Sequence, residues 1–245
     1  MKTLIIIPSR LAASRLPRKP LLKIRGLSMI SHVFKKAEEA NIGEVFVAAE
    51  DQEIIDDVKK NGGQAILTSK DHKTGTDRIY ELLKKIDRTD IDLVMNLQGD
   101  EPLMNTNDIK NLHDNMIKSN SYIGTLASNI LDKLIYANHN VVKVLTKEKL
   151  DFSKFVEAID FTRETHQNFQ NIYHHLGVYC FQLDTLKRFV SLKQSLNEKK
   201  NKLEQLRALD NNIKINVALA KSAPIGVDTE EDYLAIKKIM EYKSE

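Results

Sequence analysis

The first half of the chain alternates short apolar runs with segments whose apolar residues recur at helical spacing. The runs are short and rich in branched residues, which is typical of buried strands. They are TLIII at 3–7, EVFVAA at 44–49, QAILT at 64–68 and DLVMNL at 92–97. The helical spacing lies between successive runs, at 29–37, 54–58 and 79–86. This alternation predicts a parallel sheet with helices on both faces, an α/β fold of the Rossmann-like type.

The second half is less regular, and we expect the sheet to become mixed there. Strands are predicted over YIGTLA at 122–127, NVVKVLT at 140–146, HHLGVYCF at 174–181 and KINVALA at 214–220. NKLEQLRAL at 201–209 predicts a helix, and the polar segments 146–157 and 193–202 are expected outside the core. A last helix is predicted within 228–242, where Thr229 and Asp232 have the spacing of a capping box.

Length and composition narrow the class of protein. With 245 residues, the chain is expected to form one domain with a small embellishment. The 37 Lys and Arg against 34 Asp and Glu leave a net charge of +3, which does not favour a nucleic-acid partner. Cys180 is the only cysteine, which excludes an intramolecular disulfide and fits a reducing compartment. The first apolar run stops at Pro8, so we expect a cytoplasmic protein without a membrane partner.

The stretch IIIPSRLAASRLPRKPL, residues 5–21, places several cations directly after the first predicted strand. In an open parallel sheet ligands bind beyond the carboxyl ends of the strands, so Arg10, Arg15 and Lys19 are predicted to meet an anion such as a triphosphate. For an arbitrary basic cluster, a solvated loop is the more frequent explanation. Pro17 and Pro20 shift the balance, because a stiff loop loses less entropy on binding. The GxGxxG and GxxxxGK[ST] patterns are both missing, so side chains would hold the phosphates.

Two acidic residues far apart in the chain are candidates for a divalent cation. Asp100 follows the predicted strand 92–97 in QGDEP, and Asp228 precedes the last helix in PIGVDTEED. If these segments converge, the two carboxylates would hold Mg²⁺ against the phosphates of a nucleotide. Lys19 would then stabilise charge on an attacked α-phosphate. A turn position for Asp100 and a helix N-cap for Asp228 are the alternatives.

Seven motifs in order resemble one family, the CMP-Kdo synthetases, or 3-deoxy-manno-octulosonate cytidylyltransferases. They are IIIPSRLAASRLPRKPL, TGTDR, NLQGDEPL, NVVKV, HHLGVY, KLEQLRAL and GVDTEEDY. The resemblance implies a Rossmann-like nucleotidyltransferase with a mixed, mostly parallel central sheet and a small inserted element for dimerisation and sugar binding. It implies a Mg²⁺-dependent reaction of CTP with the acid sugar Kdo that yields CMP-Kdo and pyrophosphate for lipopolysaccharide synthesis. A homodimer is also implied.

The resemblance also implies roles for individual residues. Lys19, Asp100 and Asp228 would be catalytic, with the two aspartates as the metal pair. Nucleotide binding is implied for Arg10, Arg15, Lys19, Thr74 and Gly75. Sugar binding is implied for Arg78, Gln98, Arg163, His175, Glu204 and Gln205. Simpler alternatives are an Arg78 paired with Asp77 or Glu81, a His175 satisfied in the core, and Glu204 and Gln205 exposed on a helix.

The sequence departs from the family pattern at a few positions, which keeps other functions open. Arg18 stands where glycine is usual, AAED at 48–51 differs from the common form, and FTRETHQN at 161–168 lacks the usual proline. The acid sugar could therefore be an 8-amino relative of Kdo, or a sialic acid relative. A non-catalytic nucleotide-binding regulator is the alternative of another class, and the intact Lys19, Asp100 and Asp228 argue against it.

Overall fold

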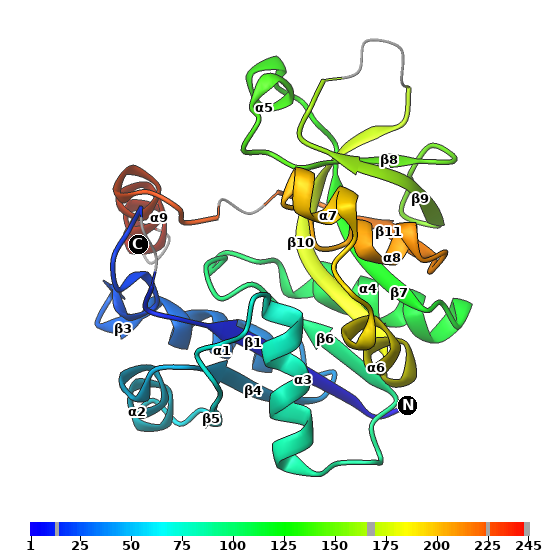
Figure 1. The fold of residues 1–245 in the computed structure, drawn as a ribbon. Coiled ribbons are helices and arrows are strands. Elements are labelled where there is room, and N and C mark those ends of the chain that lie inside the picture. The colour runs from blue at the N-terminus through cyan, green and yellow to red at the C-terminus, as the bar shows by residue number, and fades with distance from the viewer. Residues whose placement is uncertain (13–14, 166–169, 224–225, 243–245) are drawn as a thin grey trace. The chain divides into compact units, whose positions relative to one another are not determined.

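The computed structural model describes residues 1–12, 15–165, 170–223 and 226–242 (Figure 1). Its residues group into two compact units. The N-terminal unit comprises 2–91, 95–109 and 224–245, and the central unit comprises residue 1, 92–94 and 110–223. The single domain over 1–245 expected from the sequence stays a prediction.

Parallel strands form the sheet of the N-terminal unit. β4 (Glu44–Ala49) pairs in parallel with β1 (Thr3–Ser9) on one side and with β5 (Ala65–Leu67) on the other. β6 (Leu93–Asn96) adjoins β1, and its residues are divided between the two units. These four strands coincide with the four apolar runs of the sequence, and the side chains of Leu4 to Ile7 are completely buried.

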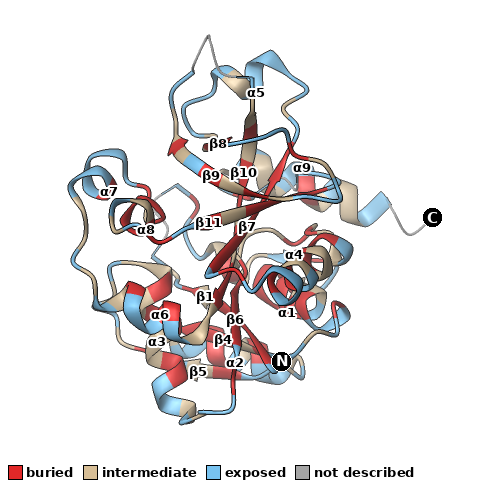
Figure 2. Cartoon of the chain, turned by 90° about the vertical axis from the view of Figure 1, so that its right-hand side faces the viewer, coloured by how far each residue is buried: buried red, intermediate tan, exposed pale blue. Residues whose placement is uncertain are grey.

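Three helices of this unit follow the predicted helical spacing. They are α1 (Met29–Glu39), α2 (Gln52–Lys60) and α3 (Gly75–Ile86). Each carries buried residues along one face, and these include Val33 on α1, Ile55 on α2 and Leu82 on α3. Figure 2 colours the chain by this burial. The apolar stripe thus decides which face of each helix is buried.

Shorter elements complete the unit. The turn η1 (Lys19–Leu21) is followed by a hairpin of β2 (Lys23–Ile24) and β3 (Leu27–Ser28). α9 (Glu230–Tyr242) ends the described chain. The predicted capping box at its start is confirmed, because Thr229 Oγ1 accepts from the Asp232 N–H at 3.2 Å and Asp232 Oδ2 accepts from the Thr229 N–H at 2.9 Å.

The central unit has a mixed sheet. Its strands are β7 (Ile123–Ser128), β8 (Lys143–Thr146), β9 (Phe155–Thr162), β10 (Ile172–Gln182) and β11 (Ile215–Leu219). β7 and β11 pair in parallel, whereas β10 with β7, β11 with β9 and β8 with β9 are antiparallel. β8 pairs with β10 as well, so the pairing of the five strands forms a closed circuit. The expected α/β fold with a mixed sheet is confirmed, and the parallel pairs are concentrated in the N-terminal unit.

Several helices lie outside the predicted set. α4 (Thr106–Ser119) runs from the N-terminal into the central unit, and the central unit adds α5 (Lys133–Ala137) and α6 (Leu183–Ser191). The continuous helix expected over 201–209 is wrong. The chain instead forms α7 (Leu196–Asn201) and α8 (Leu206–Asp210), because Lys202 adopts a left-handed conformation with φ 53° and ends α7.

The expectation that 146–157 and 193–202 lie outside the core is also wrong in part. β9 begins at Phe155, and Val156 is buried on it. Glu198 is only 4% exposed although it lies in a highly charged stretch. None of the described helices is long and apolar enough to span a membrane.

Candidate active site

The N-terminal unit contains a cavity of about 440 Å³ at the carboxyl ends of its strands. Segments that follow β1, β5 and β6 form its walls together with the segment before α9. The predicted residues on these walls are Arg10, Arg15, Lys19, Thr74, Gly75, Arg78, Gln98, Asp100 and Asp228. Its volume is in the range of small-ligand sites. The structure therefore brings together the whole predicted nucleotide and metal set.

Lys19 contacts both carboxylates that the sequence assigns to a metal in this cavity. Its ammonium donates to Asp100 Oδ2 at 2.6 Å, to the Val227 carbonyl at 2.7 Å and to Asp228 Oδ1 at 3.3 Å. The Lys19 side chain is 15% exposed, so water screens these contacts only in part. Asp100 and Asp228, 128 positions apart in the numbering, thus meet at one cation. Their predicted convergence is what the structure shows.

The arginines of the same loop are more open to solvent. Arg15 Nη2 lies 3.0 Å from Asp228 Oδ2, and both side chains are about half exposed. Arg10 is exposed on the cavity wall. An exposed ion pair contributes little to stability. Both guanidinium groups are therefore available to an anion that enters the cavity.

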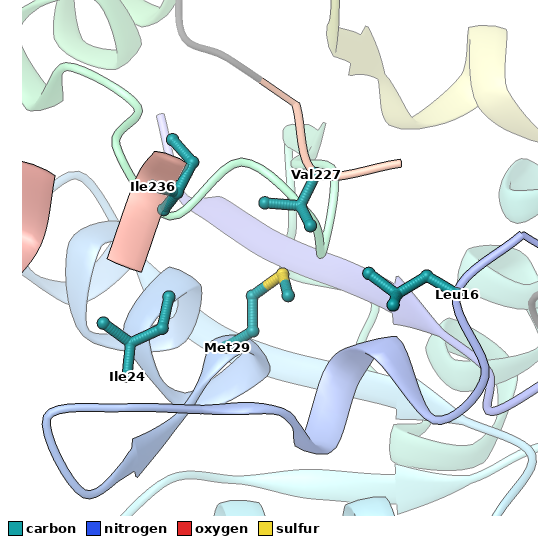
Figure 3. Packing of buried hydrophobic residues seen from close by; sticks show 5 residues of the cluster. All are labelled: Leu16, Ile24, Met29, Val227 and Ile236. Atoms are coloured by element: carbon teal, nitrogen blue, oxygen red, sulfur yellow. The ribbon is translucent and has the colours of Figure 1, made fainter. Parts of the chain in front are cut away.

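Apolar contacts anchor the two segments that carry these charges (Figure 3). Leu16, which follows Arg15, and Val227, which precedes Asp228, belong to one buried cluster with Ile24, Met29 and Ile236. The Val227 N–H donates to the Asp100 carbonyl at 3.0 Å, which ties the segment before α9 to the segment after β6. The charged groups thus stand on a packed base, so their orientation costs less entropy on binding.

Two further contacts shape the cavity walls. The Leu11 N–H donates to Asp51 Oδ2 at 2.9 Å, which fixes the start of the loop after β1. Thr74, on the cavity wall, caps α3, since its Oγ1 accepts from the Asp77 N–H at 3.2 Å. A Cβ at Gly75 would lie 3.3 Å from Pro8 Cγ, and one at Gly99 would lie 3.2 Å from the Pro8 carbonyl oxygen. The glycines allow these segments to approach the end of β1.

Arg78 forms a buried part of the wall. It is 4% exposed, and it pairs with Glu50 and donates to Thr68 Oγ1 at 2.6 Å and to the Ser69 carbonyl at 3.1 Å. Its carboxylate partner is thus Glu50 of AAED, and not Asp77 or Glu81 on its own helix. Sequence spacing could not reveal this pair, because Glu50 follows another strand. A direct sugar contact by Arg78 stays a prediction.

Glu101 differs from its neighbour Asp100. Burial and the adjacent Asp100 carboxylate raise the pKa of Glu101 to about 8, although Lys19 opposes the rise. Its Oε2 is buried without a hydrogen-bond partner among the described residues. A carboxyl group with this pKa is mostly protonated at neutral pH, so Glu101 lacks the charge that Asp100 presents to a cation.

The central unit holds the other four residues predicted to bind a sugar. His175 is 7% exposed, and its Nε2 lies 2.9 Å from Thr125 Oγ1. Since the Thr125 hydroxyl can give its proton to the Val178 carbonyl at 2.7 Å, His175 would donate from Nε2. Burial lowers the pKa of His175 to about 3, so the ring is neutral. These contacts match the alternative of a satisfied core histidine, and a sugar contact stays a prediction.

Arg163 and its surroundings are held by backbone carbonyls. Arg163 Nη1 donates to the Asn140 carbonyl at 2.9 Å and to the His139 carbonyl at 3.3 Å. The buried Lys143 donates to the Arg163 carbonyl and to the Asn138 carbonyl, both at 2.8 Å. Burial lowers the pKa of Lys143. The altered segment after Arg163 continues into residues 166–169, which lie outside the described residues.

Glu204 and Gln205 lie between α7 and α8 rather than on an exposed helix. Gln205 is 8% exposed, and Glu204 Oε1 is buried. Burial, with a smaller contribution from the Glu204 carboxylate, raises the pKa of Tyr179 well above its usual value. Glu204 therefore lies near Tyr179 of β10, where the sequence alone did not place it.

Cations after the first strand of an α/β sheet that face two carboxylates at its carboxyl edge are the arrangement of a nucleotidyltransferase site. The comparisons are more specific. A family model described as cytidylyltransferase matches residues 4–215, and the chain belongs to this family.

Two curated relatives and one solved structure match over nearly the whole chain. The 3-deoxy-manno-octulosonate cytidylyltransferase of Afipia carboxidovorans is 42% identical over 97% of this chain and 96% of its own length. That of Rhodopseudomonas palustris is 42% identical over 98% of each chain. The solved structure of a CMP:2-keto-3-deoxy-manno-octonic acid synthetase complexed with CTP is 33% identical, with a TM-score of 0.89 over 99% of this chain and 100% of that one. The family resemblance inferred from the motifs is confirmed.

Proposed function

We propose that this protein transfers the cytidylyl group of CTP to the acid sugar Kdo, giving CMP-Kdo and pyrophosphate for lipopolysaccharide biosynthesis. The observation that carries the proposal is the meeting of Lys19, Asp100 and Asp228 in one cavity. The full-length relatives named 3-deoxy-manno-octulosonate cytidylyltransferase support it, and so does the structural neighbour that holds CTP.

The residues of the cavity divide the work of an in-line displacement at the α-phosphate. A sugar hydroxyl oxygen forms a bond to the α-phosphorus and loses its proton to solvent, and the bond from that phosphorus to the pyrophosphate oxygen breaks. Lys19 stabilises the charge that builds on the α-phosphate, while Arg10 and Arg15 bind the departing pyrophosphate. Positioning and charge stabilisation account for most of the rate in such transfers.

The carboxylates of the cavity fit a divalent cation. Two hard oxygen donors, Asp100 Oδ2 and Asp228 Oδ1, already converge on a positive charge, that of Lys19. Among the described residues, no group of three or more His, Cys, Asp or Glu could hold a metal ion. Asp100 and Asp228 are the protein ligands that we propose. We propose Mg²⁺, which, when bound, supplies positive charge beside the phosphate oxygens and usually keeps non-protein ligands.

The remaining roles are proposed residue by residue. Thr74 and Gly75, at the start of α3, would contact the cytidine. Arg78 and Gln98 of the N-terminal unit, with Arg163, His175, Glu204 and Gln205 of the central unit, would recognise the sugar. The carboxylate of Kdo favours arginine, and its hydroxyls favour neutral and acidic hydrogen-bonding groups. The finer choice between Kdo, its 8-amino relative and a sialic acid relative depends on these residues.

A cytoplasmic homodimer is part of the proposal. Large apolar side chains of the central unit are exposed, namely Leu131, Leu134, Ile135, Phe152 and Ile159. Exposed apolar side chains in such number favour a protein partner, and a second copy of the chain is the partner proposed. Cys180, the only cysteine, is buried and its burial raises its pKa, which suits a reducing compartment.

A panel of pyrophosphate-release assays tests the function. We expect release with CTP, Mg²⁺ and Kdo, and much slower release with ATP, GTP or UTP or with other acid sugars. Lys19→Ala and Asp100→Ala should each lower kcat/KM by about 100-fold or more, the loss typical of a removed charge-stabilising group. Full activity of Asp100→Ala would contradict the metal pair. CTP binding by the wild type without turnover of any acid sugar would favour the non-catalytic regulator.

A further inference from the structure

In the central unit, a buried ion pair joins the two ends of the segment that carries Glu204 and Gln205. Arg207 donates from Nε to Glu198 Oε2 at 2.9 Å and from Nη2 to Glu198 Oε1 at 2.5 Å. The Arg207 and Glu198 side chains are only 2% and 4% exposed. The contact is bidentate, so it fixes the direction of both groups as well as their distance.

The carboxylate of Glu198 has further donors. Its Oε2 accepts from the Ser195 N–H at 3.1 Å, and its Oε1 accepts from Gln194 Nε2 at 3.1 Å. Ser195 completes a capping box, because its Oγ accepts from the Glu198 N–H at 3.1 Å. Each carboxylate oxygen thus has two donors, which is the condition under which a buried charge is tolerated.

The segment between the two charged residues is fixed by its own contacts. Lys202 ends α7 in the left-handed region, and Leu203 and Leu206 are each 4% exposed. The Leu203 N–H donates to the Glu198 carbonyl at 3.2 Å, and the Arg207 N–H donates to the Glu204 carbonyl at 3.1 Å. Glu204 and Gln205 are therefore held from the side of Glu198 and from the side of Arg207.

A series of aromatic contacts runs from Arg207 to His175 on β10. The Arg207 guanidinium lies 4.6 Å from the ring centre of Phe189 on α6. From Phe189 the ring centres continue to Phe181 at 5.8 Å, from Phe181 to Tyr179 at 6.0 Å, and from Tyr179 to His175 at 5.4 Å. These spacings are those of packed aromatic pairs. One guanidinium is thus connected to three of the four residues of this unit predicted to meet the sugar.

We propose that Glu198 and Arg207 form a positioning pair that sets Glu204 and Gln205 for recognition of the acid sugar, an inference that rests on the proposed function. Stability alone does not account for such a pair, because two apolar side chains of similar volume often serve a core as well or better. A bidentate pair, in contrast, defines the geometry of the intervening residues. Neither Glu198 nor Arg207 needs to touch the substrate.

Two variants separate positioning from stability. In Arg207→Lys the charge remains and the fork is lost, whereas the double variant Glu198→Leu with Arg207→Met removes both charges and fills the space. We expect the double variant to keep a melting temperature close to the wild type. In both variants the KM for Kdo should rise about tenfold or more, since misplacement of contact residues by about 1 Å has effects of this size or larger. The KM for CTP should stay within about twofold, because its proposed residues belong to the N-terminal unit.

Amide hydrogen exchange supplies a measurement that needs no activity. Exchange at residues 202–206 should be faster in both variants than in the wild type, and exchange in β1 and β4 should be unchanged. Lys187→Met is the matched control, because it breaks the exposed Lys187–Asp184 pair on α6 of the same unit. This control should leave both KM values and the exchange of 202–206 as in the wild type.

The outcomes distinguish this inference from the function on which it rests. If the wild type turns over Kdo and the variants show the wild-type KM for Kdo, the positioning role is wrong and the function stands. An equal rise of both KM values would also overturn it, because that result indicates general damage. If the wild type turns over no acid sugar, the proposed function fails, and unchanged exchange at 202–206 would then overturn the pair's hold on this segment as well.

Discussion

At the scale of single residues, Lys19 occupies the place where a divalent cation is proposed. Its ammonium lies within 2.6 Å of Asp100 and 3.3 Å of Asp228, the two carboxylates assigned to the metal. Two positive charges cannot share this position at low cost, since their repulsion is screened only in part in a half-buried site. With a metal held by both carboxylates, Lys19 would therefore exchange a carboxylate for the nucleotide phosphates.

This exchange predicts an unusual effect of Lys19→Met. The variant leaves Asp100 and Asp228 without the ammonium, so we expect Mn²⁺ to bind the nucleotide-free protein several-fold more tightly than the wild type, while turnover falls by about 100-fold or more. Electron paramagnetic resonance of free Mn²⁺ measures the affinity. Lys23→Met is the control, because it removes the same charge from the neighbouring hairpin. An unchanged Mn²⁺ affinity in Lys19→Met would contradict the metal pair.

Residues that meet at the carboxyl edge of the sheet could be predicted from the sequence. Lys19 and Asp100 follow predicted strands, and parallel strands bring such residues to one edge. The partners of Leu11 and Arg78 could not be predicted in this way. Asp51 and Glu50 contact them across the fold, and no spacing along the chain relates them. The same holds for the Val227 carbonyl, since a backbone acceptor has no signature in the side-chain pattern.

At the scale of elements, Glu81 connects α3 to the segment that precedes it. It accepts from the Ser69 N–H at 2.9 Å, pairs with Lys85 at 2.8 Å and contacts His72. Burial by itself would raise the pKa of Glu81, but the hydrogen bonds from Lys85, His72 and the Ser69 N–H outweigh it and lower the pKa to about 2. This carboxylate joins α3 to Ser69 and His72, which come shortly before Thr74 and Gly75 in the chain.

A lowered pKa makes this contribution depend on pH. The Glu81 carboxylate stabilises the folded state fully above its unfolded pKa of 4.5, and this stabilisation is lost as the pH falls towards about 2. Glu81→Gln should therefore lower the free energy of unfolding at pH 7 by about 2 kcal/mol, and the difference from the wild type should shrink as the pH falls towards about 3. Urea denaturation at both pH values measures it.

The control for this prediction is Glu231→Gln, which removes an exposed carboxylate in the first turn of α9. Its effect should be small at both pH values, since an exposed charge near a helix terminus contributes a few tenths of a kcal/mol to about 1 kcal/mol. A Glu81→Gln difference that persists undiminished at about pH 3 would show that the amide disturbs packing, and that the carboxylate charge is not the cause.

Helices whose apolar residues follow one regular repeat could be predicted from the sequence. Helices that end at a local change of backbone conformation could not. α1 to α3 have a single apolar stripe, so the pattern defines both the helix and its buried face. Over 201–209, Leu203 and Leu206 are three apart and both are buried, which imitates a helix face. The helix α7 ends at Lys202, and Glu198 of α7 pairs with Arg207 of α8. A side-chain contact between two elements decides this geometry, and local propensity has no information about it.

At the scale of the molecule, the pattern of the sequence predicts the parallel half of the sheet better than the antiparallel half. Buried parallel strands are continuous apolar runs, as in Leu4 to Ile7. In the central unit β9 mixes buried and exposed positions, with Val156 buried and Ile159 47% exposed, so its pattern is weak. Such strands are specified by pairing with distant partners. Their exposed apolar side chains are available for contact with a partner protein.

A second copy of the chain is the partner that we propose, and the segment 131–135 offers the sharpest test. Leu131 and Leu134 are 94% and 78% exposed, so charged substitutions there should leave the fold intact. We expect Leu131→Asp with Leu134→Asp to shift the protein from dimer to monomer in size-exclusion chromatography with light scattering. The melting temperature should fall only by the amount that loss of the dimer itself causes. Leu234→Asp on α9, where the leucine is 55% exposed, is the matched control and should remain dimeric.

A wild type that is monomeric at all concentrations tested would refute the dimer. A double variant that stays dimeric would place the contact elsewhere on the chain, because two buried aspartates without partners oppose association strongly.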